Sequence, residues 1–293
     1  MSLRDMRTNG VEKGPRRSLG GWRGCWALLF AWLMVPSAGA AGETVYVGAN
    51  IRAADRVSIG QIDHGAWDRL LQEYVDDAGR VDYARWKRTT DDVRALDRYL
   101  KRLSTASRER PAAEEAQLAY WINAYNAVTV RGILREYPTT SIRNHTAKLF
   151  GYNIWKDLQL VVDGAGVSLD AIEHEILRKM GEPRIHFAIV CAAKSCPRLL
   201  NEAYGAGQLD EQLTRNGRHF FRQSGNFRLD PSRRTIELSS IMKWFGEDFG
   251  SRTEDQLRAI APYLPTAEAQ RAALSGEYSV SYLSYDWSLN SAD

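Results

Sequence analysis

The stretch AYWINAYNAVTV, residues 119–130, decides the fold expected of this chain. Its residues are apolar at almost every position around a helix, so the helix must be buried on all sides rather than along one face. We expect this helix to run from about Ala112 to Arg135, after Pro111 and before the pair Tyr137–Pro138. The other elements must then pack around it.

Helices and short strands are expected on both sides of this segment. Apolar spacing predicts helices over 64–75, 91–104 and 168–181, the last with Ser168 as its N-cap and Gly181 at its end. NFRLD-PSRR-TIELS predicts a hairpin, SIMKWFGEDFG starts a run of short helices, and VDYARW and the terminal EYSVSYLSYDW predict extended pieces. We therefore expect one α+β domain over residues 61–290, with several helices packed on a small, mainly antiparallel sheet.

The first forty residues predict an export signal. Basic residues precede a short apolar run, CWALLFAWLMV, and an Ala-x-Ala pattern ends at Ala40. The run of about 11 residues is shorter than the roughly 20 that span a bilayer. We expect cleavage after Ala40, a poorly structured lead-in over 41–60, and a periplasmic or secreted protein without stable membrane insertion. The export route, general secretory or twin-arginine, stays open.

Removal of this leader changes the charge of the chain. The full sequence has 39 basic and 36 acidic side chains, but the first forty residues hold six basic and two acidic ones, which leaves a net charge of about −1. No nucleic-acid partner follows from such a balance. The partner expected is a small-molecule or peptide ligand of unknown identity.

Two asparagines interrupt the apolar helix. Asn123 and Asn126 share a face at a spacing of three, and Tyr125 adds a hydroxyl nearby. A buried amide without partners costs roughly 1–3 kcal/mol, so something must bind both side chains. They either hold neighbouring backbone, or Asn123 orients a histidine or binds substrate.

The helix AIEHEILRKM, residues 171–180, carries a second polar group. Glu173 lies beside the apolar side of this helix, and His174 forms an i, i+4 pair with Arg178. A histidine–arginine pair on a helix surface is ordinarily solvated. Alternatively, Glu173 and His174 reach into a cleft together.

RIHFAIVCAAKSCPRLL, residues 184–200, contains both cysteines that follow the leader. A strand over 185–192 places His186 and Cys191 on opposite faces, with Cys191 on the apolar, inaccessible side. Cys196 follows in a turn, where it folds back toward His186 and is the more accessible thiol. The Cys-x4-Cys spacing fits neither a Cys-x-x-Cys redox motif nor a zinc site, so we expect no metal and no cofactor. A 191–196 disulfide remains open.

Several of these segments together resemble the domain-of-unknown-function family 547. They are YWINAYNA, SLDAIEHEILR, PRIHFAIVCAAKSCPRL, WFGEDF and YDWSLN, so the resemblance covers nearly all of the chain after the leader. The activity of this family is not established. The resemblance implies signature positions at Asn123, Asn126, Glu173, His174, Arg178, His186, Ser195, Cys196 and Pro197. Val190 stands where the family pattern has an asparagine, which puts any role of that amide in doubt.

The leading hypothesis is a thiol-dependent hydrolase or acyltransferase with a papain- or transglutaminase-like arrangement. Cys196 is the nucleophile, His186 its base, and Asn123 or Glu173 orients the imidazole. The supporting or binding residues are His174, Arg178, Asn126, Tyr125, Lys194 and Ser195, with backbone around Lys194 to Cys196 as oxyanion donors. The alternative is a non-catalytic periplasmic binding or structural module with a 191–196 disulfide.

Overall fold

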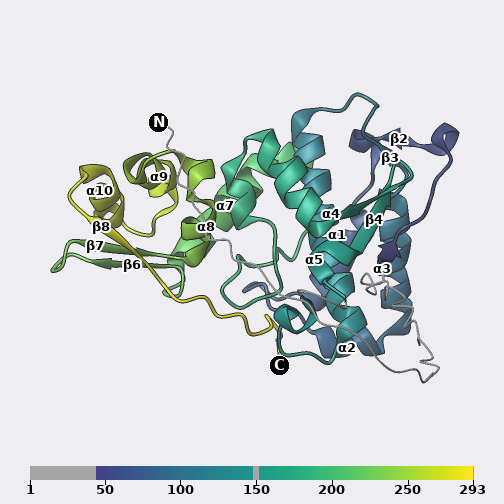
Figure 1. Ribbon diagram of the computed structural model, residues 1–293, viewed down its shortest axis with the longest axis horizontal. Helices are drawn as coiled ribbons and strands as arrows, with labels where there is room; N and C mark the ends of the chain where they lie inside the picture. The colour runs from purple at the N-terminus through teal and green to yellow at the C-terminus, as the bar shows by residue number, and fades with distance from the viewer. Residues whose placement is uncertain (1–43, 148–151, 293) are drawn as a thin grey trace, which may run out of the picture. The chain divides into compact units, whose positions relative to one another are not determined.

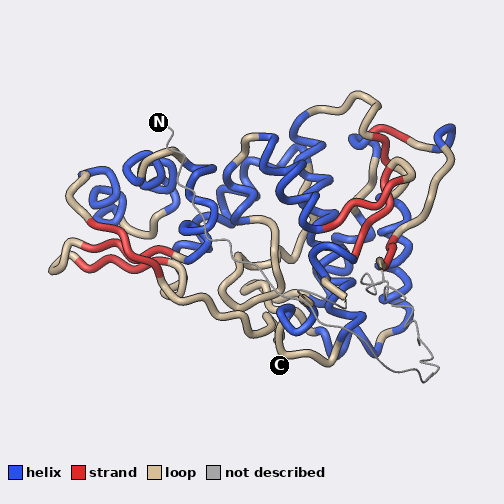
Figure 2. Tube along the Cα trace, in the orientation of Figure 1, coloured by secondary structure: helices blue, strands red, loops and turns tan. Residues whose placement is uncertain are grey.

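The computed structural model describes residues 44–147 and 152–292. Helices dominate these ranges and the strands are short, so the α+β class is confirmed (Figure 1 and Figure 2). The export signal expected over residues 1–40, with cleavage after Ala40, lies outside the described residues. No helix in the described ranges is both long enough and apolar enough to cross a membrane.

Helix α4, Glu114–Glu136, is the centre around which its neighbours pack. Every residue from Leu118 to Val130 is buried, as the all-round apolar pattern predicts. The helix ends at Glu136, directly before Tyr137–Pro138. Helix α3, Thr90–Leu103, packs along it, and α1, Gly65–Tyr74, packs in turn on α3.

The extended piece expected at VDYARW is wrong, because Tyr83–Arg88 forms helix α2. The Asp82 side chain accepts a hydrogen bond from the Arg85 backbone N–H and so caps this helix. Tyr83 and Trp86 are both buried, and their spacing of three is helical rather than extended. Val81, just before the helix, makes isolated β-bridges to Val75 and Ser291.

The strands of the described residues divide among three small sheets, of which two are mixed and one, β2 with β3, is a parallel pair. β4 pairs in parallel with β1 and antiparallel with β5, β2 pairs in parallel with β3, and β7 pairs antiparallel with β6 and in parallel with β8. The lead-in expected to be poorly structured supplies β1 and β2. The bounds are β1 Val45–Val47, β2 Val57–Ser58, β3 Ala106–Ser107, β4 Leu158–Val162, β5 Ala165–Ser168, β6 Phe227–Asp230, β7 Thr235–Leu238 and β8 Ser279–Tyr282.

The segment after β5 is helical but changes its winding twice. Helix α6, Leu169–Ala171, continues into a π-helical turn, Ile172–Leu177, and then a 3-10 turn, Arg178–Met180. As expected, the Ser168 side chain caps the start, and Gly181 ends the segment with φ +74°. π-helical turns are rare and occur frequently at functional sites.

The strand expected over residues 185–192 is also wrong. Pro183–Phe187 is a 3-10 helix, and residues 188–191 follow without joining a sheet. The Asn126 side chain instead donates to the Ala188 carbonyl at 3.0 Å and accepts from the Val190 N–H at 2.9 Å. A side chain of α4 therefore satisfies backbone groups that a neighbouring strand would otherwise satisfy.

The buried hydrophobic side chains form two clusters. The first cluster surrounds α4. The second cluster lies among elements that follow α4 in the sequence, and Phe187 belongs to it. Phe187 reaches the second cluster while Ile185 and Ala188 pack in the first, so this loop joins the two. The remaining helices are α5 Ile154–Asp157, α7 Leu209–Arg222, α8 Ser240–Phe249, α9 Thr253–Ile260 and α10 Ala267–Ser275.

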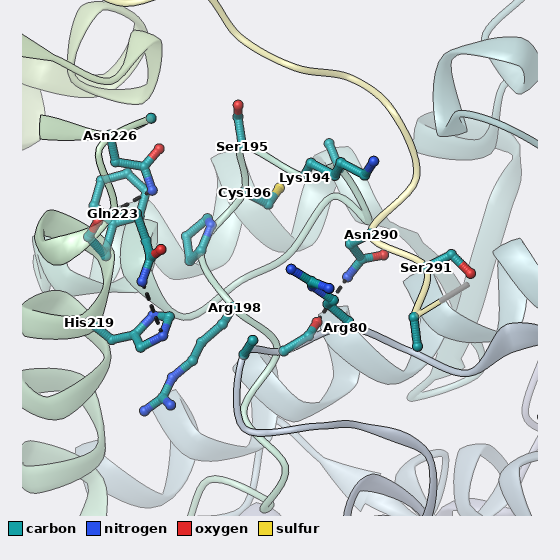
Figure 3. Close-up of a pocket in the computed structure, with 17 residues that line it drawn as sticks. Arg80, Lys194, Ser195, Cys196, Arg198, His219, Gln223, Asn226, Asn290 and Ser291 are labelled. Carbon is teal, nitrogen blue, oxygen red and sulfur yellow. Dashed lines mark hydrogen bonds between the residues drawn. The ribbon is translucent and has the colours of Figure 1, made fainter.

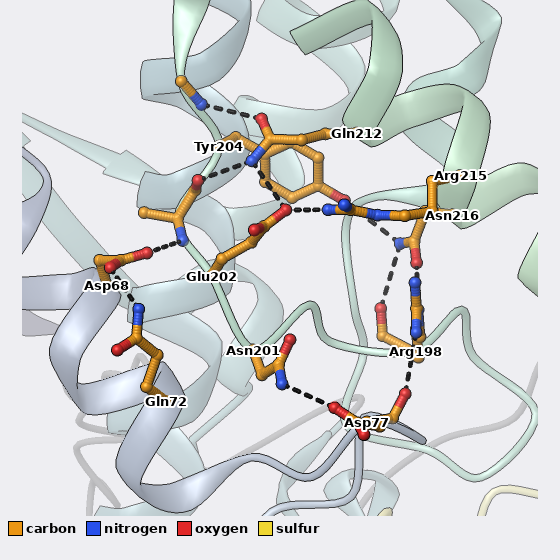
Figure 4. A network of polar contacts seen from close by, with 12 residues as sticks. Asp68, Gln72, Asp77, Arg198, Asn201, Glu202, Tyr204, Gln212, Arg215 and Asn216 are labelled. Carbon is orange, nitrogen blue, oxygen red and sulfur yellow. Dashed lines mark hydrogen bonds and ion pairs between the residues drawn. The ribbon is translucent and has the colours of Figure 1, made fainter. Parts of the chain in front are cut away.

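A network of polar contacts holds the loop between Cys196 and α7 (Figure 4). The Asp68 carboxylate accepts from the Ala203 N–H, and Gln212 donates to the Ala203 carbonyl. The Arg198 guanidinium donates to Asn216 and to the Asp77 carbonyl oxygen. These contacts come from α1, from α7 and from the loop after α1. They therefore fix the path of the loop between Cys196 and α7.

The segment after β8, residues 283–292, returns to the first cluster. Leu289 N–H donates to Thr140, Asn290 N–H donates to Ala192, and Val81 N–H donates to Asn290. Backbone N–H groups of Lys194 and Ser195 donate to carbonyls of the same segment. This returning segment therefore ties the loop that carries the cysteines to the elements around α4.

Candidate functional site

A cavity of about 190 Å³, called here the aromatic pocket, gathers half of the candidate site residues singled out in the sequence. Glu173, His174, His186, Cys191 and Cys196 all line it. The structure thus brings Glu173, His174 and His186 together at one pocket. The rest of the lining is Tyr125, Trp155, Asp170, Ile189, Pro197, Ile241, Trp244, Phe245, Tyr285 and Trp287.

Glu173 lies on the π-helical turn and faces α4. The Tyr125 hydroxyl donates a hydrogen bond of 3.0 Å to its carboxylate. Burial raises the pKa of Glu173, while His174, the Tyr125 hydrogen bond and Arg178 act in the opposite direction. Removal from water disfavours the charged form, so this carboxyl can hold or release a proton inside the pocket.

His186 is almost completely buried, and Asp248 of α8 accepts a hydrogen bond of 2.7 Å from its Nε2. Arg178 binds the same carboxylate with two hydrogen bonds, at 2.6 and 2.7 Å, and contacts His174 at 3.3 Å. Burial lowers the pKa of His186 even though Asp248 favours the charged ring. The imidazole is therefore neutral near neutral pH: Nε2 carries the proton that it donates to Asp248, and Nδ1 is unprotonated.

Asp248 itself was not among the predicted site residues. Burial pushes its pKa up, but hydrogen bonds from Arg178 and His186 bring the pKa below the ordinary aspartate value, so it is ionised. The segment WFGEDF, which contains Asp248, is part of the family resemblance. This resemblance was the one feature of the sequence that could have identified Asp248 as a site residue. Only the fold shows that α8 packs beside the 3-10 helix of His186.

Cys191 and Cys196 form a disulfide, with their Cα atoms 6.2 Å apart. Cys191 is half-buried and Cys196 is 8% exposed, so the expected order of accessibility is reversed. The reason is that no strand carries Cys191 into the core. The Cys196 sulfur accepts from the Cys191 N–H at 2.9 Å and from the Tyr285 hydroxyl at 3.1 Å. The Tyr285 oxygen lies equally close to the Cys191 sulfur.

The Asn123 side chain binds backbone rather than a histidine. Its side chain donates to the Tyr204 carbonyl at 2.8 Å and accepts from the Tyr204 N–H at 2.9 Å. Asn126 makes the equivalent pair of contacts with the loop at Ala188 and Val190. Both asparagines therefore hold backbone of neighbouring loops, which was the structural alternative.

The backbone around Lys194 to Cys196 offers no free oxyanion donors. The Lys194 N–H donates to Ser288, the Ser195 N–H to Asp286 and the Cys196 N–H to Ala193. The Ser195 hydroxyl is also used, because it accepts from the Asp286 N–H at 2.8 Å. Lys194 and Ser195 line a different pocket from Glu173 and His186.

Aromatic rings form one wall of the aromatic pocket. Tyr285 and Trp287 have ring centres 4.5 Å apart, and Trp244 lies 4.9 Å from Tyr285. Phe245 stacks on the His186 ring at 4.4 Å. Burial and the nearby Glu173 raise the pKa of Tyr285, which keeps its hydroxyl proton available to the two sulfurs. In residues 44–147 and 152–292, no three acidic, histidine or cysteine side chains converge as a metal site.

Part of the chain matches a known protein-family model. Residues 110–221 match the family model described as "Protein of unknown function, DUF547". No curated protein and no solved structure matches the chain. The matched range includes α4, Glu173, His186 and both cysteines, whereas Asp248 and Tyr285 lie beyond it.

Proposed function

The chain carries a DUF547 domain, and we propose that it performs thiol–disulfide exchange in the aromatic pocket, with Cys191 and Cys196 as the redox-active pair. The observation that carries this proposal is the set of contacts on the Cys196 sulfur. It accepts hydrogen bonds from the Cys191 N–H and the Tyr285 hydroxyl. Such donors stabilise a thiolate, which makes Cys196 the better leaving group.

The exchange starts at Cys191, the more exposed of the two cysteine residues. A substrate thiolate attacks the Cys191 sulfur, a mixed disulfide forms, and the bond to Cys196 breaks, with both electrons of that bond staying on the Cys196 thiolate. A second substrate thiolate then attacks the substrate sulfur of the mixed disulfide. The substrate leaves as a disulfide, and the protein retains two reduced cysteines.

Proton transfer is supplied by the groups that share this pocket. The neutral His186 ring, held by Asp248, is suited to accept the proton of an incoming thiol. Glu173, whose pKa is raised by burial, is suited to donate a proton to a departing thiolate. Export to an oxidising compartment, as the leader predicts, would keep the pair oxidised between turnovers.

A thiol-dependent hydrolase or acyltransferase is less well supported. Its nucleophile must be a free thiolate, whereas both sulfurs are bonded here. Acyl transfer also needs donors for an oxyanion, and the backbone N–H groups of Lys194, Ser195 and Cys196 all have carbonyl partners. Thiol–disulfide exchange has no oxyanion and needs neither feature.

The test is reaction of the oxidised protein with reduced glutathione, followed by acid quenching and peptide mass spectrometry. We expect a glutathione adduct on Cys191 and then a reduced pair. Tyr285→Phe should slow reduction about tenfold, because it removes a hydrogen bond to a developing charge. The matched control is Tyr282→Phe, which alters an exposed tyrosine of β8 and should react at the parent rate. A disulfide that stays intact in excess glutathione would refute the exchange.

A second candidate, a non-catalytic binding module, is favoured by the aromatic wall of the same pocket. Trp244, Tyr285 and Trp287 surround a space that also meets the carboxyls of Asp170 and Glu173. Aromatic faces beside carboxylates suit a ligand that carries an amine on an aromatic ring system. Tryptamine should then bind and indole-3-acetate should not, as measured by calorimetry on protein whose disulfide is intact.

A further inference from the structure

A second and larger cavity, called here the basic pocket, has no role in the exchange proposed above. Its volume is about 500 Å³, and it shares Cys196 and Pro197 with the aromatic pocket. The loop after α1, the cysteine loop, the end of α7 and the returning segment all contribute to its wall (Figure 3). It is therefore a cavity built by four separate parts of the chain.

The charge of this cavity is of one sign. Arg80, Lys194 and Arg198 line it, and no carboxylate is among its lining residues in the described part of the chain. Arg198 is held in place by Asn216 and the Asp77 carbonyl, whereas Arg80 extends toward the middle of the view in Figure 3. Cations grouped in a concave space attract anions more strongly than the same charges on an open surface.

Asn226, which lines the same cavity, carries a buried acceptor without a partner in the described part of the chain. Asn226 is 4% exposed, and its side-chain nitrogen donates to the Phe220 carbonyl at 3.3 Å. A carbonyl only accepts, so this contact fixes the amide orientation and leaves Oδ1 on the other side. That oxygen is buried and has no hydrogen-bond partner within the described residues.

His219 adds a second unsatisfied atom to the wall. Its Nδ1 is buried without a partner in the described chain, while its Nε2 lies 3.4 Å from the Gln223 amide. Buried polar atoms without partners are rare, and two of them on one cavity wall require an explanation. A bound ligand that donates and accepts hydrogen bonds at this wall provides one.

We propose that the basic pocket binds a small anion whose phosphate or carboxylate group meets the three cations and whose hydroxyl or amino group donates to Asn226 Oδ1. The two requirements act together. A charge-assisted hydrogen bond to arginine provides affinity, and the donor opposite it provides selectivity for hydroxylated or aminated anions over simple ones.

The experiment measures binding to the complete, oxidised protein by titration calorimetry at constant ionic strength. Glycerol 3-phosphate and glycerate test the two anionic groups, neutral glycerol tests the need for charge, and methyl phosphate tests the need for a hydroxyl donor. We expect one or both charged, hydroxylated probes to bind. Methyl phosphate should bind about tenfold more weakly than glycerol 3-phosphate, because Asn226 Oδ1 stays unpaired.

Variants then separate a specific site from general charge attraction. Arg80→Gln/Lys194→Gln should weaken binding of the successful probe about tenfold or more. The control Arg94→Gln/Lys101→Gln removes the same charge from α3, outside the pocket, and should bind as the parent does. The proposal is overturned if neither anion binds, if glycerol or methyl phosphate binds as tightly as glycerol 3-phosphate, or if both double variants weaken binding equally.

Discussion

At the scale of single residues, the two asparagines of α4 show what sequence can and cannot assign. Their burial and their need for partners follow from the apolar pattern of residues 119–130. Their partners do not, because Tyr204, Ala188 and Val190 are backbone positions brought close only by the fold. A side chain that binds backbone leaves no pattern in the sequence of its partner.

Substitution Asn123→Leu should lower the free energy of unfolding by roughly 1–3 kcal/mol, because the Tyr204 N–H and carbonyl lose their partner in a dry environment. Asn144→Leu is the control. Asn144 is exposed, so its replacement should change stability by about 0.5 kcal/mol or less. Urea unfolding measures both. Equal effects of the two substitutions would contradict a buried amide–backbone pair.

Glu173 makes stability depend on pH in a direction that can be stated. Its folded pKa lies above the ordinary value of 4.5, so above pH 4.5 the folded protein binds more protons at this site than the unfolded chain does. Stability therefore falls as pH rises from 4.5 through the folded pKa. Glu173→Gln, which does not titrate, should melt higher relative to the parent at pH 7 than at pH 4.5. A melting difference independent of pH would show that Glu173 titrates normally.

At the scale of elements, prediction succeeded where periodicity was long and failed where it was short. The helices around α4 have several turns of repeated apolar spacing, and the structure contains them at nearly the expected bounds. The run from Ile185 to Ala192 is apolar but brief, and such a run does not distinguish a strand from a buried loop. Pro183 at the start of the 3-10 helix was the local signal against a strand.

Two glycines with the same backbone conformation should respond differently to alanine. Gly79 has φ +79° and Gly181 has φ +74°, so both substitutions carry the strain of a left-handed residue. A Cβ on Gly79 would lie 2.3 Å from Arg198 Cβ and 2.6 Å from its Cα, whereas nothing lies within 4 Å at Gly181. Gly79→Ala should therefore destabilise by about 1–3 kcal/mol more than Gly181→Ala. Equal melting temperatures would mean that the loop at Arg198 moves freely.

At the scale of the whole molecule, the matched family range is smaller than the unit that builds the pockets. The core around α4 includes Trp67, Tyr83 and Leu289, all outside residues 110–221. The Asp248 carboxylate and the Tyr285 hydroxyl also come from beyond that range. Sequence alone indicated the class and the central helix, but not that the returning segment closes both pockets.

A fragment of residues 110–221 should therefore fail to fold by itself. It would expose the faces of α4 that pack on α3 and on the aromatic side chains that precede α4 in the sequence. The free energy lost when several large side chains are no longer buried exceeds the free energy of unfolding of a typical domain. Residues 44–293 are the comparison and should fold. Near-ultraviolet circular dichroism and cooperative urea unfolding distinguish the two. A cooperative transition in the short fragment would prove this domain boundary wrong.

Cys196 and Pro197 belong to the walls of both pockets, and this shared wall has a thermodynamic consequence. If a ligand in one pocket displaces these two residues, the binding free energy of a ligand in the other pocket changes. Reciprocity then fixes the size of the effect, because the factor by which the first occupant changes the affinity of the second equals the factor in the reverse direction. Anion binding and reduction of the disulfide are linked in the same way. An anion that binds the oxidised form more tightly must therefore shift the midpoint potential of the cysteine pair toward more reducing values.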